Sequence, residues 1–270
     1  MPEPKVIAII YDFDKTLATS DMQNFKFIPN LGMEPNDFWN ATTDFSEAHQ
    51  CERISSYLYV MMDLCKKKNI ELTEEYLMSL GKYCNYYEGV LTWFDRINKY
   101  GEERGVKIEH YIISSGNNEI LKGTKIADKF TKMFACEFVY DENGVACWPK
   151  IIINYTSKTQ CLFRISKGVL DITEDKKVNE KVEDKHVEFS NMIYIGDGVT
   201  DIPCMTLIKE RNGLSVAVYK SGNSESAKQL VEDKRVNAAV TADYREGTKL
   251  DQIVKAKINL LSLQIKHSAD

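Results

Sequence analysis

Short apolar runs rich in β-branched residues recur along this chain of 270 residues, and helical patterns separate several of them. The first run, VIAIIY at residues 6–11, is continuously apolar, which is typical of a strand that is buried on both faces of a parallel sheet. Strands that alternate with helices predict an α/β fold with a doubly wound parallel sheet. We expect further strands at residues 110–113, 192–195, 214–218 and, with a weaker pattern, 238–240.

Residues 21–87 follow a different pattern, because they contain no run that predicts a strand. Apolar residues spaced by three and four positions predict an amphipathic helix over residues 54–65, and Thr73 followed by Glu74 is suited to begin another helix. The apolar positions of that second helix are Tyr76, Leu77, Leu80, Tyr83 and Cys84. These helices could form a layer on the sheet, but their place directly after the first strand favours an inserted module that covers the end of that strand.

The rest of the chain fits one core domain around this insertion. We therefore predict a core of residues 1–20 and 88–270 and an inserted all-helical module of residues 21–87. The sequence DENG at residues 141–144 predicts a hairpin, because Asn-Gly between apolar segments favours a tight turn. The charge-rich residues 171–185 predict a solvated loop or a surface helix.

The composition argues against several classes of function. The net charge is −5 and no long block of Lys or Arg is present, which disfavours nucleic acid and anionic membranes as partners. No segment approaches the roughly 18 apolar residues of a membrane span, and the start of the chain lacks the pattern of a secretory signal. The seven cysteines include no CxxC pair, which favours buried thiols in a reducing compartment. We expect a soluble, cytoplasmic protein.

Two aspartates follow the first predicted strand, within the sequence DFDKT at residues 12–16. In an open α/β sheet, ligands bind beyond the carboxyl ends of the strands, so Asp12 and Asp14 stand where chemistry usually occurs. Two carboxylates this close repel each other unless a cation or a shared proton separates them. An aspartate in this position can also simply cap a helix, so the pair alone does not establish a site.

A second acidic sequence, GDGVTD at residues 196–201, follows another predicted strand. Its glycines let the backbone approach a ligand closely, and Asp197 and Asp201 are spaced so that both can face one site as a helix begins. A turn capped by an aspartate is the alternative, but two such strand ends in one chain argue against coincidence. Carboxylates that converge there require a hard cation, and Mg²⁺ is suited because it binds carboxylates, water and substrate phosphate.

A third strand end carries SSGN at residues 114–117. A hydroxyl followed by backbone N–H groups that open a helix forms a cradle for an anion, although the same sequence also suits an ordinary turn. Such a site also needs a fixed positive charge. Lys158 and Lys167 are the candidates, and the composition around them does not choose between the two.

Together these sequences resemble the motifs of the haloacid dehalogenase (HAD) superfamily of phosphatases. DFDKT resembles the first motif, IISSG the second and GDGVTD the fourth, and Lys158 in SKTQCLFRI is placed like the lysine of the third motif. The resemblance spans residues 12–201 and implies a HAD Rossmann-like core. The helical insertion is similar to the C1 cap of the phosphoserine-phosphatase-like branch. Asp14 has no counterpart in the dehalogenases of the superfamily, so its presence favours phosphate chemistry.

The resemblance implies a role for each matching residue. Asp12 would be the nucleophile that forms an aspartyl-phosphate, and Asp14 would protonate the leaving alcohol and then activate water. Lys158 would balance the charge of the nucleophile and of the transferring group. The other implied assignments are phosphate binding by Ser114, the backbone N–H of Ser115 and Thr16, which would also steady the motif loop. Asp12, the carbonyl of Asp14, Asp197 and Asp201 would bind Mg²⁺.

The implied function is that of a HAD-type phosphatase, a phosphoric monoester hydrolase that uses Mg²⁺ and a small phosphorylated metabolite. Two other functions remain open: phosphotransfer or sugar-phosphate isomerisation with the same residues, and a non-catalytic binding scaffold. The interval between Lys158 and Asp197 is longer than in compact phosphoserine phosphatases, so Lys167 stays an alternative and we do not expect a phosphoserine phosphatase. The candidates for substrate contact in the helical module are Asp21, Gln23 and Arg53, each of which also fits an ordinary surface position.

Overall fold

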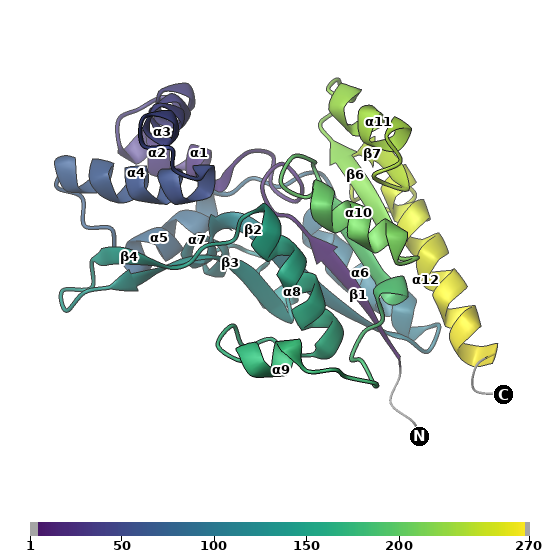
Figure 1. The fold of residues 1–270 in the computed structure, drawn as a ribbon. Coiled ribbons are helices and arrows are strands. Elements are labelled where there is room, and N and C mark those ends of the chain that lie inside the picture. Colours follow the sequence, from purple (N-terminus) through teal and green to yellow (C-terminus); the bar gives the residue numbers. More distant parts are fainter. Residues whose placement is uncertain (1–4, 268–270) are drawn as a thin grey trace.

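One mixed sheet organises the part of the chain that the computed structural model describes, residues 5–267. Within it, seven strands lie in the order β4-β3-β2-β1-β5-β6-β7, and every neighbouring pair except β3 and β4 is parallel (Figure 1). The predicted doubly wound α/β fold is therefore confirmed. The strands are β1 Val6–Tyr11, β2 Lys107–Asn117, β3 Lys132–Tyr140, β4 Ala146–Ile151, β5 Met192–Gly196, β6 Leu214–Tyr219 and β7 Ala238–Thr241.

The central strand β1 places the predicted site by its register. Its last residue, Tyr11, lies opposite Ile112 of β2 on one side and Ile195 of β5 on the other. The next backbone N–H, that of Asp12, still donates to the carbonyl of Ile195 at 3.0 Å. The polar sequences that follow these three strands therefore emerge side by side at one edge of the sheet.

Strand β2 is longer than its apolar run predicts. It continues through residues 114–117, with Asn117 paired to Cys136 of β3 after an irregularity in the register. The expected helix follows directly, with Asn117 as its N-cap, although residues 114–117 themselves stay extended and belong to the strand. The next helix, α7 Asn118–Lys122, begins one residue later.

The predicted hairpin is present, and it extends the sheet. Strands β3 and β4 pair in antiparallel fashion around residues 141–144, where Asp141 Oδ1 accepts from the N–H groups of Asn143 and Val145. Gly144 has a φ of +76°, which its lack of a Cβ allows. Because β3 is also parallel to β2, the hairpin forms the edge of the same sheet.

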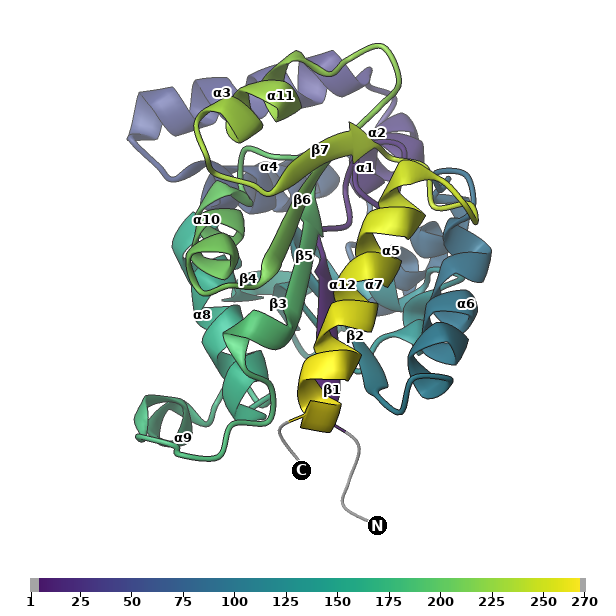
Figure 2. The same cartoon turned by 90° about the vertical axis from the view of Figure 1, so that its right-hand side faces the viewer.

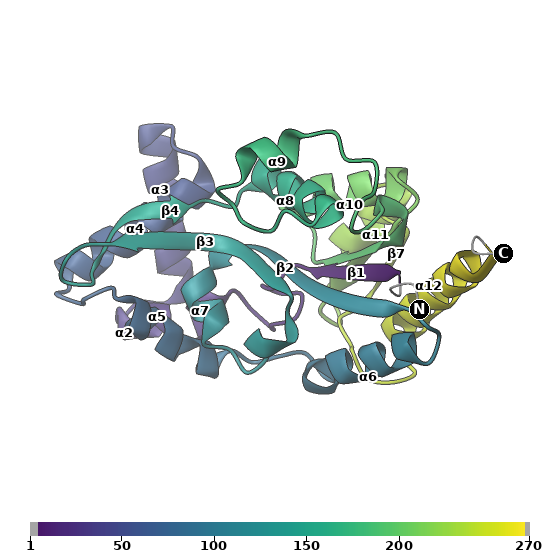
Figure 3. The ribbon, with the colours of Figure 1, turned by 90° about the horizontal axis from the view of Figure 1, so that it is seen from below.

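Helices cover both faces of the sheet. Figures 2 and 3 show α8 and α10 on one face and α6 and α12 on the other. Across residues 5–267, none of the helices is both long and apolar enough to cross a membrane. The core helices are α6 Val90–Glu102, α7, α8 Tyr155–Lys167, α9 Asp175–Asn179, α10 Ile202–Glu210, α11 Glu225–Glu232 and α12 Lys249–His267. The short helix α9 lies in the charge-rich stretch, as a surface helix there predicts.

The described segment 21–87 contains helices and connecting loops but no strand, apart from two isolated bridges (Figure 1). Side-chain caps start two of them as the sequence predicts: Glu52 accepts from the N–H of Ser55 and Thr73 from that of Tyr76. The segment leaves and re-enters the core through paired backbones, since Thr19 N–H donates to the carbonyl of Asn85 at 2.9 Å. The helices are α1 Met22–Phe25, α2 Phe27–Asn30, α3 Pro35–His49, α4 Arg53–Lys67 and α5 Glu74–Leu80.

Helix α5 is shorter than predicted. It ends at Leu80 and tightens into a 3₁₀ turn, Gly81–Tyr83, so Tyr83 and Cys84 do not belong to it. Gly81 explains this end, because a Cβ there would lie 2.3 Å from the carbonyl oxygen of Ile120 in α7. The close approach of the two backbones fixes α5 on the core.

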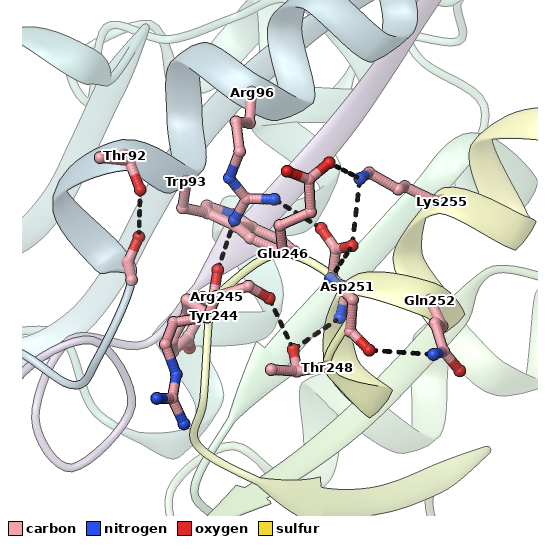
Figure 4. Close-up of polar contacts among 12 residues, drawn as sticks. Thr92, Trp93, Arg96, Tyr244, Arg245, Glu246, Thr248, Asp251, Gln252 and Lys255 are labelled. Atoms are coloured by element: carbon pink, nitrogen blue, oxygen red, sulfur yellow. Dashed lines mark hydrogen bonds and ion pairs between the residues drawn. The ribbon is translucent and has the colours of Figure 1, made fainter.

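A buried carboxylate anchors the C-terminal helix to the rest of the core. Asp251, only 2% exposed, binds Arg96 of α6 at 2.7 Å and Lys255 of α12 at 3.0 Å (Figure 4). Arg96 also donates to the carbonyl of Tyr244, and the Tyr244 hydroxyl donates to the carbonyl of Thr16 at 2.9 Å. The loop that carries Asp12 and Asp14 is thus supported by the segment before α12.

We predict that Asp251→Asn lowers the free energy of unfolding by about 1.5–3 kcal/mol, because both cations lose their shared carboxylate. Burial raises the pKa of Asp251, but the Gly247 N–H and the two cations lower it further, so the net shift is downward. The carboxylate therefore stabilises the native state above its unfolded pKa of about 3.9, and this stabilisation is lost as the pH falls through the folded pKa. Urea titrations should show the difference at pH 7 and its decrease below about pH 4.

Glu246→Gln is the matched control, since Glu246 also pairs with Lys255 but its side chain is 74% exposed. Its effect should stay within about 0.5 kcal/mol. A deficit of Asp251→Asn that is the same at pH 3 as at pH 7 would contradict the prediction.

Candidate active site

Four chain segments meet at the carboxyl ends of β1, β2 and β5. They are the loop after β1, the end of β2, the first turn of α8 and the turn between β5 and α10. The predicted residues on these segments are Asp12, Asp14, Thr16, Ser114, Ser115, Lys158, Asp197 and Asp201.

Lys158 is the fixed positive charge at this edge. Its side chain is fully buried, and its Nζ donates to Asp12 Oδ1 at 2.9 Å, to Asp201 Oδ1 at 2.7 Å and to Thr200 Oγ1 at 3.1 Å. Lys167, the alternative, instead donates to the backbone carbonyls of Val178 and Glu180. The geometry therefore places Lys158 beside the aspartates and Lys167 away from them.

The first turn of α8 holds Lys158 in place. Asn154 accepts from the N–H groups of Thr156 and Ser157 at 3.1 Å, and the Ser157 hydroxyl accepts from the N–H of Asn154 at 2.7 Å. This reciprocal capping box fixes the start of the helix. The lysine one residue later is thereby aimed at the end of β1.

Three carboxylates form a group that fits a metal ion. One oxygen each from Asp12, Asp197 and Asp201 lies within 4.8 Å of the others. Lys158 and the Tyr194 hydroxyl both donate to Oδ1 of Asp201, while its buried Oδ2 has no hydrogen-bond partner among the described residues. A hard divalent cation such as Mg²⁺ suits an all-oxygen donor set. The Asp14 carboxylate does not belong to this group. The predicted contribution of Asp14 to a metal is therefore its backbone carbonyl.

The group carries more negative charge than Lys158 balances. The pKa of Asp12 is raised to about 8. Burial is the largest cause, the Lys158 ammonium opposes it, and the carboxylates of Asp201 and Asp197 add to it. Burial, followed by the charge of Asp201, raises the pKa of Asp197 to about 7. Such carboxyls bind either a proton or a cation at neutral pH, which supports the fit to a metal.

Asp14 is held by the first helix of the inserted segment. The N–H of Met22, at the start of α1, donates to Asp14 Oδ1 at 2.7 Å. Burial, then the charges of Asp21 and Asp12, raises the pKa of Asp14 well above its usual range. Lys15, which directly follows Asp14, has a positive φ of 56° and pairs with Asp21 at 2.8 Å. The arrangement leaves Asp14 able to hold a proton near neutral pH.

The two serines at the end of β2 face different surroundings. Ser114 is fully buried, and its Oγ accepts from the N–H of Gly116 at 3.0 Å. Ser115 lines the cavity above Asp12, and its Oγ has no hydrogen-bond partner within residues 5–267. The free hydroxyl that could meet an anion is therefore that of Ser115. Thr16 lies deeper, with a buried Oγ1 that also lacks a partner.

A cavity of about 230 Å³ lies above these groups, between the sheet edge and the helical segment. Of the predicted contacts in that segment, Asp21 and Gln23 line the cavity. Arg53 does not, because its exposed side chain donates to Thr43 Oγ1 at 3.1 Å. The cavity is lined by Asp12, Asp14, Lys15, Asp21, Gln23, Trp39, Ile54, Tyr57, Ser115, Gly116, Asp197, Val199 and Thr200.

Several residues that line the cavity or support the aspartates were not predicted from the sequence. Tyr57 belongs to the apolar stripe of α4, so its spacing predicts core packing, yet its hydroxyl donates to the carbonyl of Ser115 at 2.6 Å. Tyr194 lies inside an apolar strand and supports Asp201. Thr200 is part of the GDGVTD sequence, and its hydroxyl accepts from Lys158. Only Thr200 was within a motif that pointed to it.

The chain is similar in sequence to a known protein of nearly the same length. No family model matches it. A protein of Borreliella burgdorferi described as uncharacterized is 30% identical over 286 aligned residues, which cover 94% of this chain and 97% of the relative.

Several solved structures have a similar fold. A HAD family hydrolase of Salmonella enterica serovar Typhi has a TM-score of 0.60 and 18% identity, and the match covers 94% of this chain and 72% of that one. A substrate-bound phosphoserine phosphatase has a TM-score of 0.59 and 17% identity, and the match covers 94% of this chain and 99% of that one. A phosphoserine phosphatase with an analogue of a phospho-aspartyl intermediate has a TM-score of 0.57 and 17% identity, and the match covers 93% of this chain and 99% of that one. At these identities, the similarity shows the fold.

We predict that Lys158→Met lowers the free energy of unfolding by about 3–5 kcal/mol in the presence of a chelator, because two buried carboxylates lose their counter-charge. Urea denaturation at pH 7.5 measures the change. Lys167→Met is the matched control on the same helix, and the loss of its bonds to backbone carbonyls should cost no more than about 1.5 kcal/mol. Equal losses in the two variants would contradict the role of Lys158.

Proposed function

Because the chain belongs to the family of the Borreliella burgdorferi protein and has the fold of HAD hydrolases of the phosphoserine-phosphatase type, we propose that it is a HAD-type phosphatase. The proposed reaction is hydrolysis of a small phosphomonoester with the help of Mg²⁺. The observation that carries the proposal is the buried contact of Lys158 with Asp12 and Asp201, directly beneath a cavity that Asp14 also lines. A binding scaffold would have no need for this costly arrangement of buried charge.

Asp12 is the proposed nucleophile. Its carboxylate would attack phosphorus, which forms an aspartyl-phosphate and breaks the bond from phosphorus to the leaving alcohol oxygen. Water would then attack the same phosphorus, breaking the bond to Asp12 and releasing inorganic phosphate. Lys158, at 2.9 Å from Asp12, would together with a bound cation favour the ionised carboxylate, and it would offset charge that develops on the phosphoryl group.

Asp14 is the proposed proton carrier. Its raised pKa favours the protonated carboxyl that the leaving alkoxide needs, and the carboxylate left behind would take a proton from the attacking water. The Met22 N–H on Oδ1 would fix the orientation of the carboxyl group in both steps. The hydroxyl of Ser115 would hold a phosphoryl oxygen, with Ser114 keeping the turn in shape through Gly116.

Asp12, Asp197, Asp201 and the carbonyl of Asp14 are the proposed holders of Mg²⁺. When bound, the ion supplies positive charge that neutralises the carboxylates and the substrate phosphate. We further propose the division into a core of residues 1–20 and 88–270 and a cap of residues 21–87. Since α5 is fixed on α7, α1 to α4 are the part of this cap placed to exclude water from the cavity.

We predict that Asp12→Asn lowers kcat at least about a thousandfold on a generic aryl phosphate with Mg²⁺, because an amide is a poor nucleophile. Phosphate release measures the rate, with and without a chelator. Asp37→Asn, on the exposed first turn of α3, is the control and should keep native activity. Full activity of Asp12→Asn, or activity that is indifferent to chelation, would refute the mechanism.

We also predict that Mg²⁺ raises the midpoint of thermal unfolding of the chelator-treated protein by about 5 °C at a concentration a hundred times its Kd. Asp197→Asn should abolish this shift, because it removes one of the three converging carboxylates. Asp37→Asn should keep it. An unchanged shift in Asp197→Asn would place the ion elsewhere.

A further inference from the structure

The helical side of the cavity differs in charge from the side that carries Lys158. Among the described residues, the segment 21–87 lines the cavity with one carboxylate, one amide and three apolar or aromatic side chains: Asp21, Gln23, Trp39, Ile54 and Tyr57. Lys15 is the cation in the described lining, and it is already paired with Asp21 at 2.8 Å. The part of a substrate that extends beyond its phosphate therefore meets no free positive charge there.

The hydrogen-bonding groups on this side are mostly occupied. Trp39 Nε1 donates to Asn24 Oδ1 at 2.9 Å, and the Tyr57 hydroxyl donates to the carbonyl of Ser115. Both residues therefore offer ring surface, and their ring centroids lie 6.1 Å apart. Gln23 is 1% exposed, and its Oε1 is a buried acceptor without a partner, while its Nε2 donates to Asn117. Asn117 Nδ2 also lacks a partner among the described residues, but Asn117 does not line the cavity. At the cavity wall, the unmet need of Gln23 is therefore a hydrogen-bond donor.

These features select against a second anionic group on the substrate, beyond its phosphate. A carboxylate beyond the phosphate would lie near Asp14 and Asp21 and would lose water without gaining a cation, which is costly. An ammonium group would instead donate to Gln23 and lie against aromatic rings, which attract cations. The volume of about 230 Å³ is below the usual range of roughly 300–1,000 Å³ for ligand pockets, so the alcohol must be small.

We propose that the substrate is the phosphomonoester of a small amino alcohol, which carries an ammonium group and no carboxylate. This inference rests on the proposed phosphatase function. Gln23 Oε1 accepts from the ammonium group, and Trp39 and Tyr57 provide the aromatic surface around it. The phosphate lies at the opposite end, over Asp12 and Ser115.

Four esters test the proposal on the full-length protein with Mg²⁺: O-phosphoethanolamine, O-phosphoserine, ethyl phosphate and p-nitrophenyl phosphate. Phosphoserine adds only a carboxylate to phosphoethanolamine, and ethyl phosphate lacks only its ammonium group. We expect kcat/KM for phosphoethanolamine to exceed the values for both analogues at least about tenfold. Hydrolysis of p-nitrophenyl phosphate without this order overturns the substrate class alone, whereas no hydrolysis of any ester overturns the phosphatase function with it.

Variants separate recognition from folding, because a ratio of two substrates does not depend on the fraction of folded protein. Trp39→Leu and Gln23→Leu should each lower the preference for phosphoethanolamine over ethyl phosphate about fivefold or more. Tyr59→Leu removes an aromatic ring from the outer surface of α4, where it is 50% exposed, and should leave the ratio unchanged. Equal losses on both substrates in Trp39→Leu and Gln23→Leu would overturn the assignment.

A gain of activity gives the strictest check. Ile54→Arg places a cation on the helical side of the cavity and should raise the ratio of phosphoserine to phosphoethanolamine hydrolysis about tenfold. Asn40→Arg adds the same charge on the exposed part of α3 and should not change this ratio. A native preference for phosphoserine would overturn the proposal and would point to Lys220, which lines a neighbouring cavity on the side of β6.

Discussion

The site depends on one buried ammonium group, that of Lys158. It joins the loop after β1 to the turn before α10, and these lie 146 and 43 residues from it along the chain. One lysine faces three carboxylates, and burial together with the negative charge that remains raises the pKa values of Asp12 and Asp197. Lys158 and a divalent cation together would match the three negative charges. One counter-charge is thus built into the chain, and a bound cation would supply the rest.

The sequence predicted where the acidic residues lie because each pair follows directly on an apolar strand. Parallel strands bring their carboxyl ends to one edge, so the convergence of Asp12 and Asp197 follows from strand order alone. The choice between Lys158 and Lys167 does not follow from strand order. The two lysines are nine residues apart on α8, about two and a half turns, so they face opposite sides. Helical periodicity shows that only one can enter the site, but tertiary packing decides which.

Other details depend on registers that no local pattern fixes. Adjacent strand residues face opposite sides, so the roles of Ser114 and Ser115 depend on how far β2 continues before its backbone turns. Tyr57 and Trp39 have the spacing and character of core residues, and only the folded arrangement shows that their rings line a cavity. The part of the site that performs chemistry is therefore more visible in the sequence than the part that recognises a substrate.

The hydrogen bond from Tyr244 to the carbonyl of Thr16 joins two segments that are 228 residues apart along the chain. The loop that carries Asp12 and Asp14 therefore leaves the ribosome long before the segment that supports it. Strand β1 also needs β5, made some 180 residues later, as its second neighbour. A nascent chain therefore holds its acidic loop without this support until Tyr244 has been made, so the loop and its support cannot fold together as the loop is synthesised.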